Sequence, residues 1–170
     1  MFRVSRQHLS VRAQVLGLAA WLAAGFLAAA IGAVASIQAP AFYLQLQRPA
    51  WAPPPFVFGP VWSLLYFLMS VAAWLVWRKA GFAGARFALL LYLLQLALNA
   101  LWSWLFFGWH LGAAAFADVV LLAVCIAWTT AAFRRVQVLA AGLLLPYLFW
   151  VCFAAALNYA IWQLNPALLG

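Results

Sequence analysis

Five long apolar stretches separated by short gaps constrain this chain of 170 residues more than any other feature of its sequence. A helix needs about 20 mostly apolar residues to cross the roughly 30 Å of hydrocarbon in a bilayer. The stretches that meet this requirement cover residues about 14–36, 56–77, 86–107, 111–133 and 138–162. None alternates polar and apolar residues like a membrane-barrel strand, and a helix satisfies its own backbone hydrogen bonds in lipid. The sequence therefore predicts an all-α integral membrane protein, with five transmembrane helices bundled into a single domain over residues 1–170.

The composition supports a membrane location. Hydrophobic residues make up 71% of the chain and charged residues 6%, whereas a soluble domain carries roughly 25% charged residues. The net charge of +8 could suggest nucleic acid as a partner, but the basic residues are spread over short loops between apolar spans. We expect contact with lipid headgroups instead, and no nucleic acid.

The distribution of Lys and Arg predicts the orientation, because these residues favour the cytoplasmic side of short loops. Eight of the nine lie before the first span, between the second and third, or between the fourth and fifth: Arg3, Arg6, Arg12, Arg78, Lys79, Arg86, Arg134 and Arg135. Only Arg48 lies on the opposite side. We expect a cytoplasmic N-terminus in a bacterial cell membrane. The first span resembles a signal peptide, but it is longer and lacks a convincing cleavage site, so we expect a mature helix.

Side chains suited to metal binding or conventional catalysis are too sparse to form a site. The chain has two histidines, His8 and His110, and one acid, Asp118, while Cys125 and Cys152 both lie within spans. Metal sites need clustered ligands, hydrolysis by paired carboxylates needs a second acid, and no Gly-rich phosphate loop is present. We therefore expect no metal site, no required cofactor and no conventional catalytic residue.

Asp118 lies about seven residues into the fourth span and has two interpretations. One is a proton relay or a contact to a cation, since ionisable groups within a membrane are often functional. The other is a carboxylate near the membrane edge, satisfied by a loop donor or a neighbouring helix. We favour the second, because no other titratable group lies within a span to continue a relay.

Polar and aromatic residues recur at helical spacing in three spans, which places each set on one helix face. The sets are Trp62, Tyr66, Met69 and Ala73; Gln95, Asn99, Trp102 and Phe106; and Trp150, Ala154 and Asn158. The amides could serve only to join helices, at about 0.6 kcal/mol for each hydrogen bond. We prefer a shared cavity, since flat aromatic side chains beside small residues leave room for a planar apolar ligand.

Other residues favour membrane anchoring and close helix packing. Tryptophans near span ends are typical of an interfacial belt, and they comprise Trp51, Trp77, Trp109 and Trp162. The first span carries Gly25, Ala29 and Gly32 among many alanines. Small residues let helices approach closely, either within the bundle or across a dimer.

Several motifs together give the chain a family resemblance. The loop before the second span contains Arg48-Pro49-Ala50-Trp51-Ala52-Pro53-Pro54-Pro55, and Trp62 and Tyr66 follow. The third span contains Gln95, Asn99 and Trp102, and the fifth contains Pro146-Tyr147-Leu148-Phe149-Trp150 followed by Asn158-Tyr159 and Trp162. In their order and spacing, from about residue 17 to 166, these motifs resemble the translocator protein family, also called tryptophan-rich sensory proteins or peripheral benzodiazepine receptors.

The resemblance implies a five-helix bundle, often a homodimer, whose cavity is closed by a lid formed by the Pro-rich first loop at about 37–55. Its family ligands are porphyrins such as protoporphyrin IX and haem, sterols in animals, and synthetic isoquinoline carboxamides and benzodiazepines. The positions that match the family's pocket are Trp51, Phe58, Val61, Trp62, Asn99, Trp102, Trp150, Ala154, Leu157 and Asn158. Some members degrade porphyrin photochemically through tryptophans, and Trp62 and Trp150 match those positions.

The chain also departs from the family pattern. Pro55-Phe56 replaces an Arg-Trp pair in the lid, which removes a cation that could hold porphyrin propionates. Gln163 stands where the animal sterol motif needs a basic residue after Tyr159, which argues against sterol binding through that motif. Ala114 stands where animal members have a pocket tryptophan.

The residues and the resemblance together predict a membrane receptor or carrier for porphyrins and related planar apolar ligands, with a role in tetrapyrrole regulation or transport. One alternative is light-dependent porphyrin breakdown at the tryptophan-lined cavity. Another is a regulatory or scaffold protein that acts through its dimer face. Binding and transport need the same cavity, so the sequence does not separate them.

Overall fold

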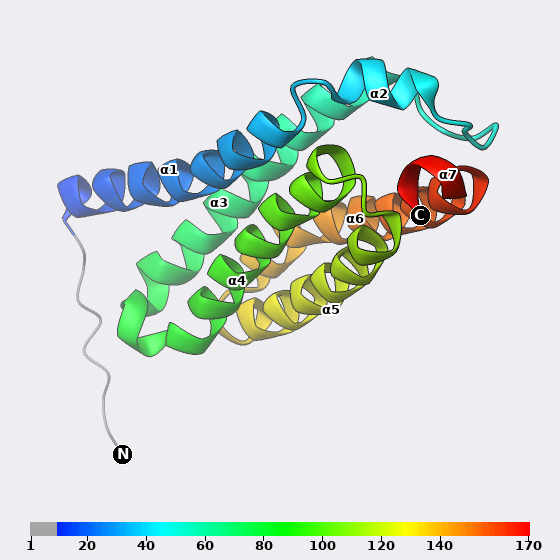
Figure 1. Cartoon of the computed structure of the whole chain (residues 1–170). Coiled ribbons are helices and arrows are strands. Elements are labelled where there is room, and N and C mark those ends of the chain that lie inside the picture. Colours follow the sequence, from blue (N-terminus) through cyan, green and yellow to red (C-terminus); the bar gives the residue numbers. More distant parts are fainter. Residues whose placement is uncertain (1–9) are drawn as a thin grey trace.

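The computed structural model describes residues 10–170 (Figure 1). Within that range, five helices are long and apolar enough to cross a membrane. They are α1 (Val11–Ala35), α3 (Phe58–Gly84), α4 (Arg86–Ser103), α5 (Gly112–Val136) and α6 (Val138–Leu164). The predicted all-α membrane protein with five spanning helices is confirmed. Arg3, Arg6 and His8 lie outside the described residues.

Short helical segments complete the fold. A 3₁₀ turn at Pro55–Val57 leads into α3, and a π-helical segment at Trp104–Gly108 continues α4. The short helix α2 (Ala39–Gln45) lies in the segment that the sequence predicts as the lid, and α7 (Pro166–Leu169) follows the fifth span. The lid is therefore partly helical, which the sequence interpretation of a Pro-rich loop missed.

One helix extends beyond its predicted bounds, because charged residues and glycine lower the hydropathy of the sequence without ending the helix. The second predicted span ends at residue 77, but α3 continues through Arg78 and Lys79 to Gly84, with Gly81 at φ +67° marking a kink. Arg78 lies over the Trp74 ring at 4.4 Å from its centroid. Basic residues with long apolar stems can extend a membrane helix beyond the hydrocarbon in this way.

The spanning helices form a closed ring of neighbours. Along this ring, α1 packs on α3, α3 on α6, α6 on α5, α5 on α4, and α4 on α1. The chain's basic turns, between α3 and α4 and between α5 and α6, lie at the same end as the start of α1, whereas α2 and α7 lie at the other end (Figure 1). We call these the basic end and the lid end.

Glycines on α1 allow its close packing inside the ring. A Cβ added at Gly17 would collide with the Trp77 indole, and one at Gly25 would collide with the Ser70 hydroxyl. The small-residue face of α1 is thus used within the bundle, the first of the two expected uses. Trp77, expected in an interfacial belt, is half-buried and packs over Gly17.

Candidate ligand-binding cavity

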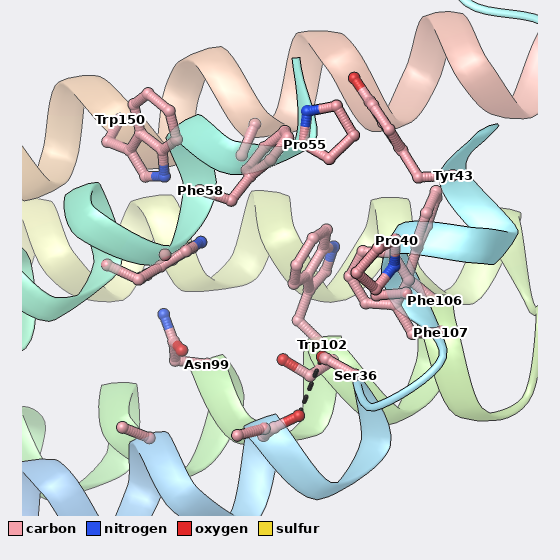
Figure 2. Close-up of a pocket in the computed structure, with 18 of the residues that line it drawn as sticks. Ser36, Pro40, Tyr43, Pro55, Phe58, Asn99, Trp102, Phe106, Phe107 and Trp150 are labelled. Carbon is pink, nitrogen blue, oxygen red and sulfur yellow. Dashed lines mark hydrogen bonds between the residues drawn. The ribbon is translucent and has the colours of Figure 1, made fainter. Parts of the chain in front are cut away.

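A cavity of about 570 Å³ lies in the lid half of the ring. Its walls come from α1, α2, the Pro55–Val57 turn, α3, α4 with its π-helical extension, and α6; in the described chain α5 supplies no lining residue. Figure 2 shows Trp150 and Phe58 on one side of this space, Asn99 and Trp102 on another, and Tyr43 and Pro40 of α2 at its lid end. The volume is within the roughly 300–1,000 Å³ typical of ligand pockets.

Most of the predicted site residues line this one cavity. They are Phe58, Trp62, Asn99, Trp102, Trp150, Ala154, Leu157 and Asn158. The structure brings together residues separated by up to a hundred positions because the inward stripes of α3, α4 and α6 converge. Their assignment as ligand contacts remains a prediction.

Two predicted site residues, Trp51 and Val61, do not line the cavity in the described structure. Trp51 is 51% exposed, and its ring packs edge-on against Phe153 at 5.7 Å. Phe153 in turn lies 5.5 Å from the ring of Trp150, so it separates Trp51 from the cavity wall. Val61 is partly buried and packs against the hydrophobic core.

Aromatic rings of α3 and α6 pack together in one wall of the cavity. Phe58 meets Trp150 edge-on at 6.0 Å, and Trp62 meets Tyr147 edge-on at 6.2 Å. These offset arrangements stabilise aromatic pairs. The Trp150 indole nitrogen is buried and has no hydrogen-bond partner within residues 10–170.

A buried hydrogen-bond chain forms the floor of the cavity towards the basic end. The Tyr66 hydroxyl donates to Asn99 Oδ1, and Asn99 Nδ2 donates to the Tyr147 hydroxyl over 2.9 Å. Asn99 is 3% exposed, and these two hydrogen bonds to protein groups fix both ends of its amide. Tyr66 was part of a predicted inward stripe but was missed as a site residue, although the stripe itself was the signal that could have identified it.

Asn158 fixes the opposite side of the cavity. It accepts a hydrogen bond from Trp102 Nε1 over 3.0 Å and donates to the Gly112 carbonyl over 3.2 Å. Trp102 is further held by stacking on Phe106 at 5.6 Å. The amides therefore join helices and shape a cavity at the same time, so the two interpretations of the stripes do not exclude one another.

α1 contributes small residues that the sequence analysis did not assign to the site. Ala29, Gly32 and Ala33 line the cavity on its far side from α6. The Ser36 hydroxyl, at the end of α1, donates back to the Gly32 carbonyl over 2.9 Å (Figure 2). Alanines occur on every face of α1, so the sequence did not indicate which of its small residues line the cavity.

The lid end is closed by α2 and the segment after it. Tyr43 and Leu46 are buried, and the Tyr43 hydroxyl donates to the Pro53 carbonyl over 3.1 Å. Burial raises the pKa of Tyr43 above its usual value, and nearby Arg48, 4.9 Å from the ring centroid, opposes that rise. The hydroxyl is thus protonated at neutral pH and able to donate.

An amide bridge fastens the lid to the end of α6. Gln47 N–H donates to Asn165 Oδ1 over 2.8 Å, and Asn165 Nδ2 donates to the Gln47 carbonyl, also over 2.8 Å. A further bond from Asn165 Nδ2 to the Ile161 carbonyl orients the side chain. We call this bridge between Gln47 and Asn165 the latch.

Asp118 lies on α5, outside the cavity lining, and is 7% exposed. Its Oδ2 atom is buried, and none of the described residues donates a hydrogen bond to it. The preferred interpretation, a carboxylate satisfied by a loop donor or a neighbouring helix, is therefore wrong for this oxygen. Among residues 10–170 no three His, Cys, Asp or Glu side chains cluster as metal ligands.

The sequence profile of the TspO/MBR family matches residues 17–163. The chain belongs to the TspO/MBR family. It is 44% identical to the human translocator protein over 126 residues, which cover 73% of this chain and 75% of that protein. It is 42% identical to the tryptophan-rich protein TspO of Chlorobaculum tepidum over 129 residues, 74% and 80% of the two chains. With protein CrtK of Rhodobacter capsulatus the identity is 39% over 143 residues, 81% and 88% of the two chains.

The positions at which this TspO/MBR member departs from the family pattern are now located. Pro55 and Phe56 line the cavity at its lid end, so the replacement of the Arg-Trp pair alters the cavity itself. Ala114 is exposed on α5, and Gln163 is exposed near the end of α6. Of the departures that the resemblance implies, only the one at 55–56 therefore lies in the cavity wall of the described chain.

Proposed function

We propose that this TspO/MBR protein is a membrane receptor or carrier that binds porphyrins, such as protoporphyrin IX or haem, in its intramembrane cavity and serves tetrapyrrole regulation or transport. The observation that carries the proposal is the shape of the cavity. Flat rings of Phe58, Trp62 and Trp150 form one wall, and small residues of α1 form the other. A planar macrocycle fits between such walls, and stacking on aromatic rings adds about 0.5–1.5 kcal/mol beyond burial of area.

The polar groups of the cavity suit a ligand that is mostly apolar with a few acceptors. The Trp150 N–H is unpartnered within the described chain, whereas the Asn99 and Asn158 amides are already bonded to protein groups. Arg48 lies beside Tyr43 at the lid end. We therefore place the ring of a bound porphyrin against α3 and α6, with its carboxylates towards the lid.

The protein's orientation follows from its charge. The basic end holds every Lys and Arg of residues 10–170 except Arg48, and cytoplasmic loops are enriched in these residues. We propose that the basic end faces the cytoplasm and the lid end faces outward in a bacterial cell membrane. A reporter that is active only in the cytoplasm, fused at Gly170, should give no signal. A strong signal would reverse the orientation.

Binding is tested by quenching of tryptophan fluorescence with protoporphyrin IX, in the dark, on purified protein in detergent. The expected result is saturable quenching that Ala154→Phe weakens at least tenfold, because Ala154 lines the cavity and a phenyl ring would occupy it. Ala156→Phe, on an exposed position of the same helix, is the matched control and should bind like the wild type. Quenching that rises linearly without saturation would overturn the proposal.

A second candidate function is light-dependent breakdown of the bound porphyrin. The supporting observation is that Trp62 and Trp150, two readily oxidised indoles, both line the cavity. Under illumination, Trp62→Phe and Trp150→Phe should suppress product formation far more than they weaken binding in the dark. If these variants lose product formation and porphyrin affinity to the same extent, the result would argue for binding alone.

A further inference from the structure

The exposed part of the cavity lining is confined to one side. Within residues 10–170, the lining side chains that are exposed belong to α1, α2, the Pro55–Val57 turn and α3, and none belongs to α4 or α6. They are Phe26, Ala33, Pro40, Phe56, Gly59 and Ser63. Pro40 and Phe56 belong to the lid end, whereas the other four lie on α1 and the beginning of α3. The exposed lining away from the lid therefore lies between α1 and the beginning of α3.

This opening exists because α1 changes its neighbour along its length. At Gly25 the helix packs so closely on α3 that an added Cβ would meet the Ser70 side chain. At Gly32 it packs on α4 instead, where a Cβ would lie 3.0 Å from Ser103 Oγ. Beyond Gly25, α1 thus moves away from α3 and leaves a gap beside the cavity.

The lid end, by contrast, is fastened. The latch joins Gln47 and Asn165 by two hydrogen bonds of 2.8 Å, and Tyr43 holds the Pro53 carbonyl. Leu46, just before the latch, is 4% exposed. A ligand that entered from water at the lid end would have to break these contacts. A ligand that entered through the gap between α1 and α3 would break none of them.

The rim of the gap is suited to hydrocarbon. Phe26 is 44% exposed, and Ala33 and Gly59 are also exposed and carry no polar side chain. The Ser63 hydroxyl donates to the Gly59 carbonyl over 2.9 Å, so it presents no free donor. None of the described lining residues is charged. An unsatisfied polar group would be costly in lipid, and the one hydroxyl on the rim, that of Ser63, is bonded.

We propose that the gap between α1 and α3 is a lateral portal, through which a ligand dissolved in the bilayer reaches the cavity without opening the lid. The inference rests on the proposed function, because it uses the same cavity. It narrows the ligand class to planar apolar molecules that partition into membranes, with any carboxylates remaining near the lid end. The portal is bounded by Phe26, Ala33, Gly59 and Ser63.

The portal is tested by narrowing it at Gly59, where an added side chain meets no atom within 4 Å. Gly142 on α6 is the matched control, because it is also exposed, helical and free of neighbours around its Cβ. Protein in liposomes is mixed with protoporphyrin IX preloaded in vesicles, and tryptophan quenching is followed by stopped flow. Gly59→Leu, alone or with Ala33→Phe, should slow association at least tenfold and slow dissociation with it. Gly142→Leu should retain the wild-type rates.

The alternative route through the lid is tested by Asn165→Ala, which removes the latch. Several-fold faster association in Asn165→Ala, with Gly59→Leu within twofold of the wild type, would overturn the portal in favour of the lid. Unchanged association with faster dissociation in Gly59→Leu would also overturn it, since that pattern means lost affinity. If the wild type itself shows no saturable quenching, the proposed function fails and the portal fails with it.

Discussion

The two halves of the helical ring use the same kinds of residue in opposite ways. In the basic half, large side chains point inward and fill the space: Tyr92, Phe133 and Leu144 are fully buried, and the Tyr92 and Phe133 rings stack at 6.2 Å. In the lid half, aromatic rings lie along the walls and leave about 570 Å³ between them. The filled half holds the helices together, and this stability allows the other half to remain hollow.

The boundary between the halves is the hydrogen-bond chain through Tyr66, Asn99 and Tyr147. On its basic side the Ser70 hydroxyl donates to the Tyr66 carbonyl over 2.7 Å. On its lid side the cavity begins. Substitutions in the three zones should therefore have different effects. They should lower stability in the filled half, ligand affinity in the hollow half, and both stability and ligand affinity at the boundary.

The largest effect is expected in the filled half. Phe133→Ala should lower the free energy of unfolding by about 3–5 kcal/mol, because a cavity would replace a fully buried ring. Unfolding in mixed micelles, followed by circular dichroism, measures this. Phe149→Ala, at a 72% exposed position on α6, is the control and should cost far less. Equal losses would mean that the basic half is not the stabilising one.

A smaller loss of stability is expected at the boundary. Asn99→Ala removes two hydrogen bonds and leaves the Tyr66 and Tyr147 hydroxyls without their amide partner, at a cost of about 1–3 kcal/mol. Gln95→Leu, one turn earlier, is the contrasting variant. In the wild type the Gln95 Oε1 is buried without a partner in the described chain, and the Gln95 Nε2 reaches only Met69 Sδ at 3.9 Å. Gln95→Leu should thus be neutral or stabilising, and a large loss there would contradict this account of the boundary.

In the hollow half, affinity should change more than stability. Trp62→Phe and Trp150→Phe should each weaken protoporphyrin IX binding by about 0.5–1.5 kcal/mol, the contribution of a well-placed aromatic contact. Trp128, 65% exposed on α5, is the control. If Trp128→Phe weakens binding as much as the cavity variants do, the assignment of the cavity walls is wrong.

The most local effect, no larger than that of the cavity tryptophans, is expected in the lid. Tyr43→Phe removes one hydrogen bond to Pro53 and should destabilise the closed lid by about 0.5–1.5 kcal/mol. Limited proteolysis of the segment 37–55 measures this as faster cleavage. Bound protoporphyrin IX should slow cleavage in both proteins by adding contacts to Tyr43, Pro55 and Phe56. Cleavage that is indifferent to the ligand would count against a lid over the cavity.

Hydropathy was enough to predict the five spans, because each crossing helix must be apolar over its whole length. Helical spacing predicted the inward faces of α3, α4 and α6, where an amide or a small residue interrupts the aromatic residues. On α1 the reasoning was incomplete. Gly25, Ala29 and Gly32 were expected on a close-packing face, and Gly25 and Gly32 do pack closely, but the place of Ala29 and Gly32 in the cavity wall was not predicted. The portal depends on where α1 leaves α3, so the sequence alone did not predict it.

Residues at the ends of the helices were harder to predict. The resemblance to the family placed Trp51 and Val61 in the pocket, but Trp51 lies behind Phe153 and Val61 packs against the core without lining the cavity. The short helix α2 begins directly before Pro40, a position where proline is well tolerated, yet the surrounding prolines favoured a loop. The carboxylate of Asp118 has an unpartnered oxygen in the described chain, and its spacing on α5 gave no sign of that.

The latch has a consequence for how the protein is made. Gln47 and Asn165 are 118 residues apart, and a chain is synthesised at about 5–20 residues per second. The lid segment therefore emerges about 6–24 s before its partner on α6 exists. Throughout that interval the nascent cavity has no fastened cover, because the latch cannot form before Asn165 is made.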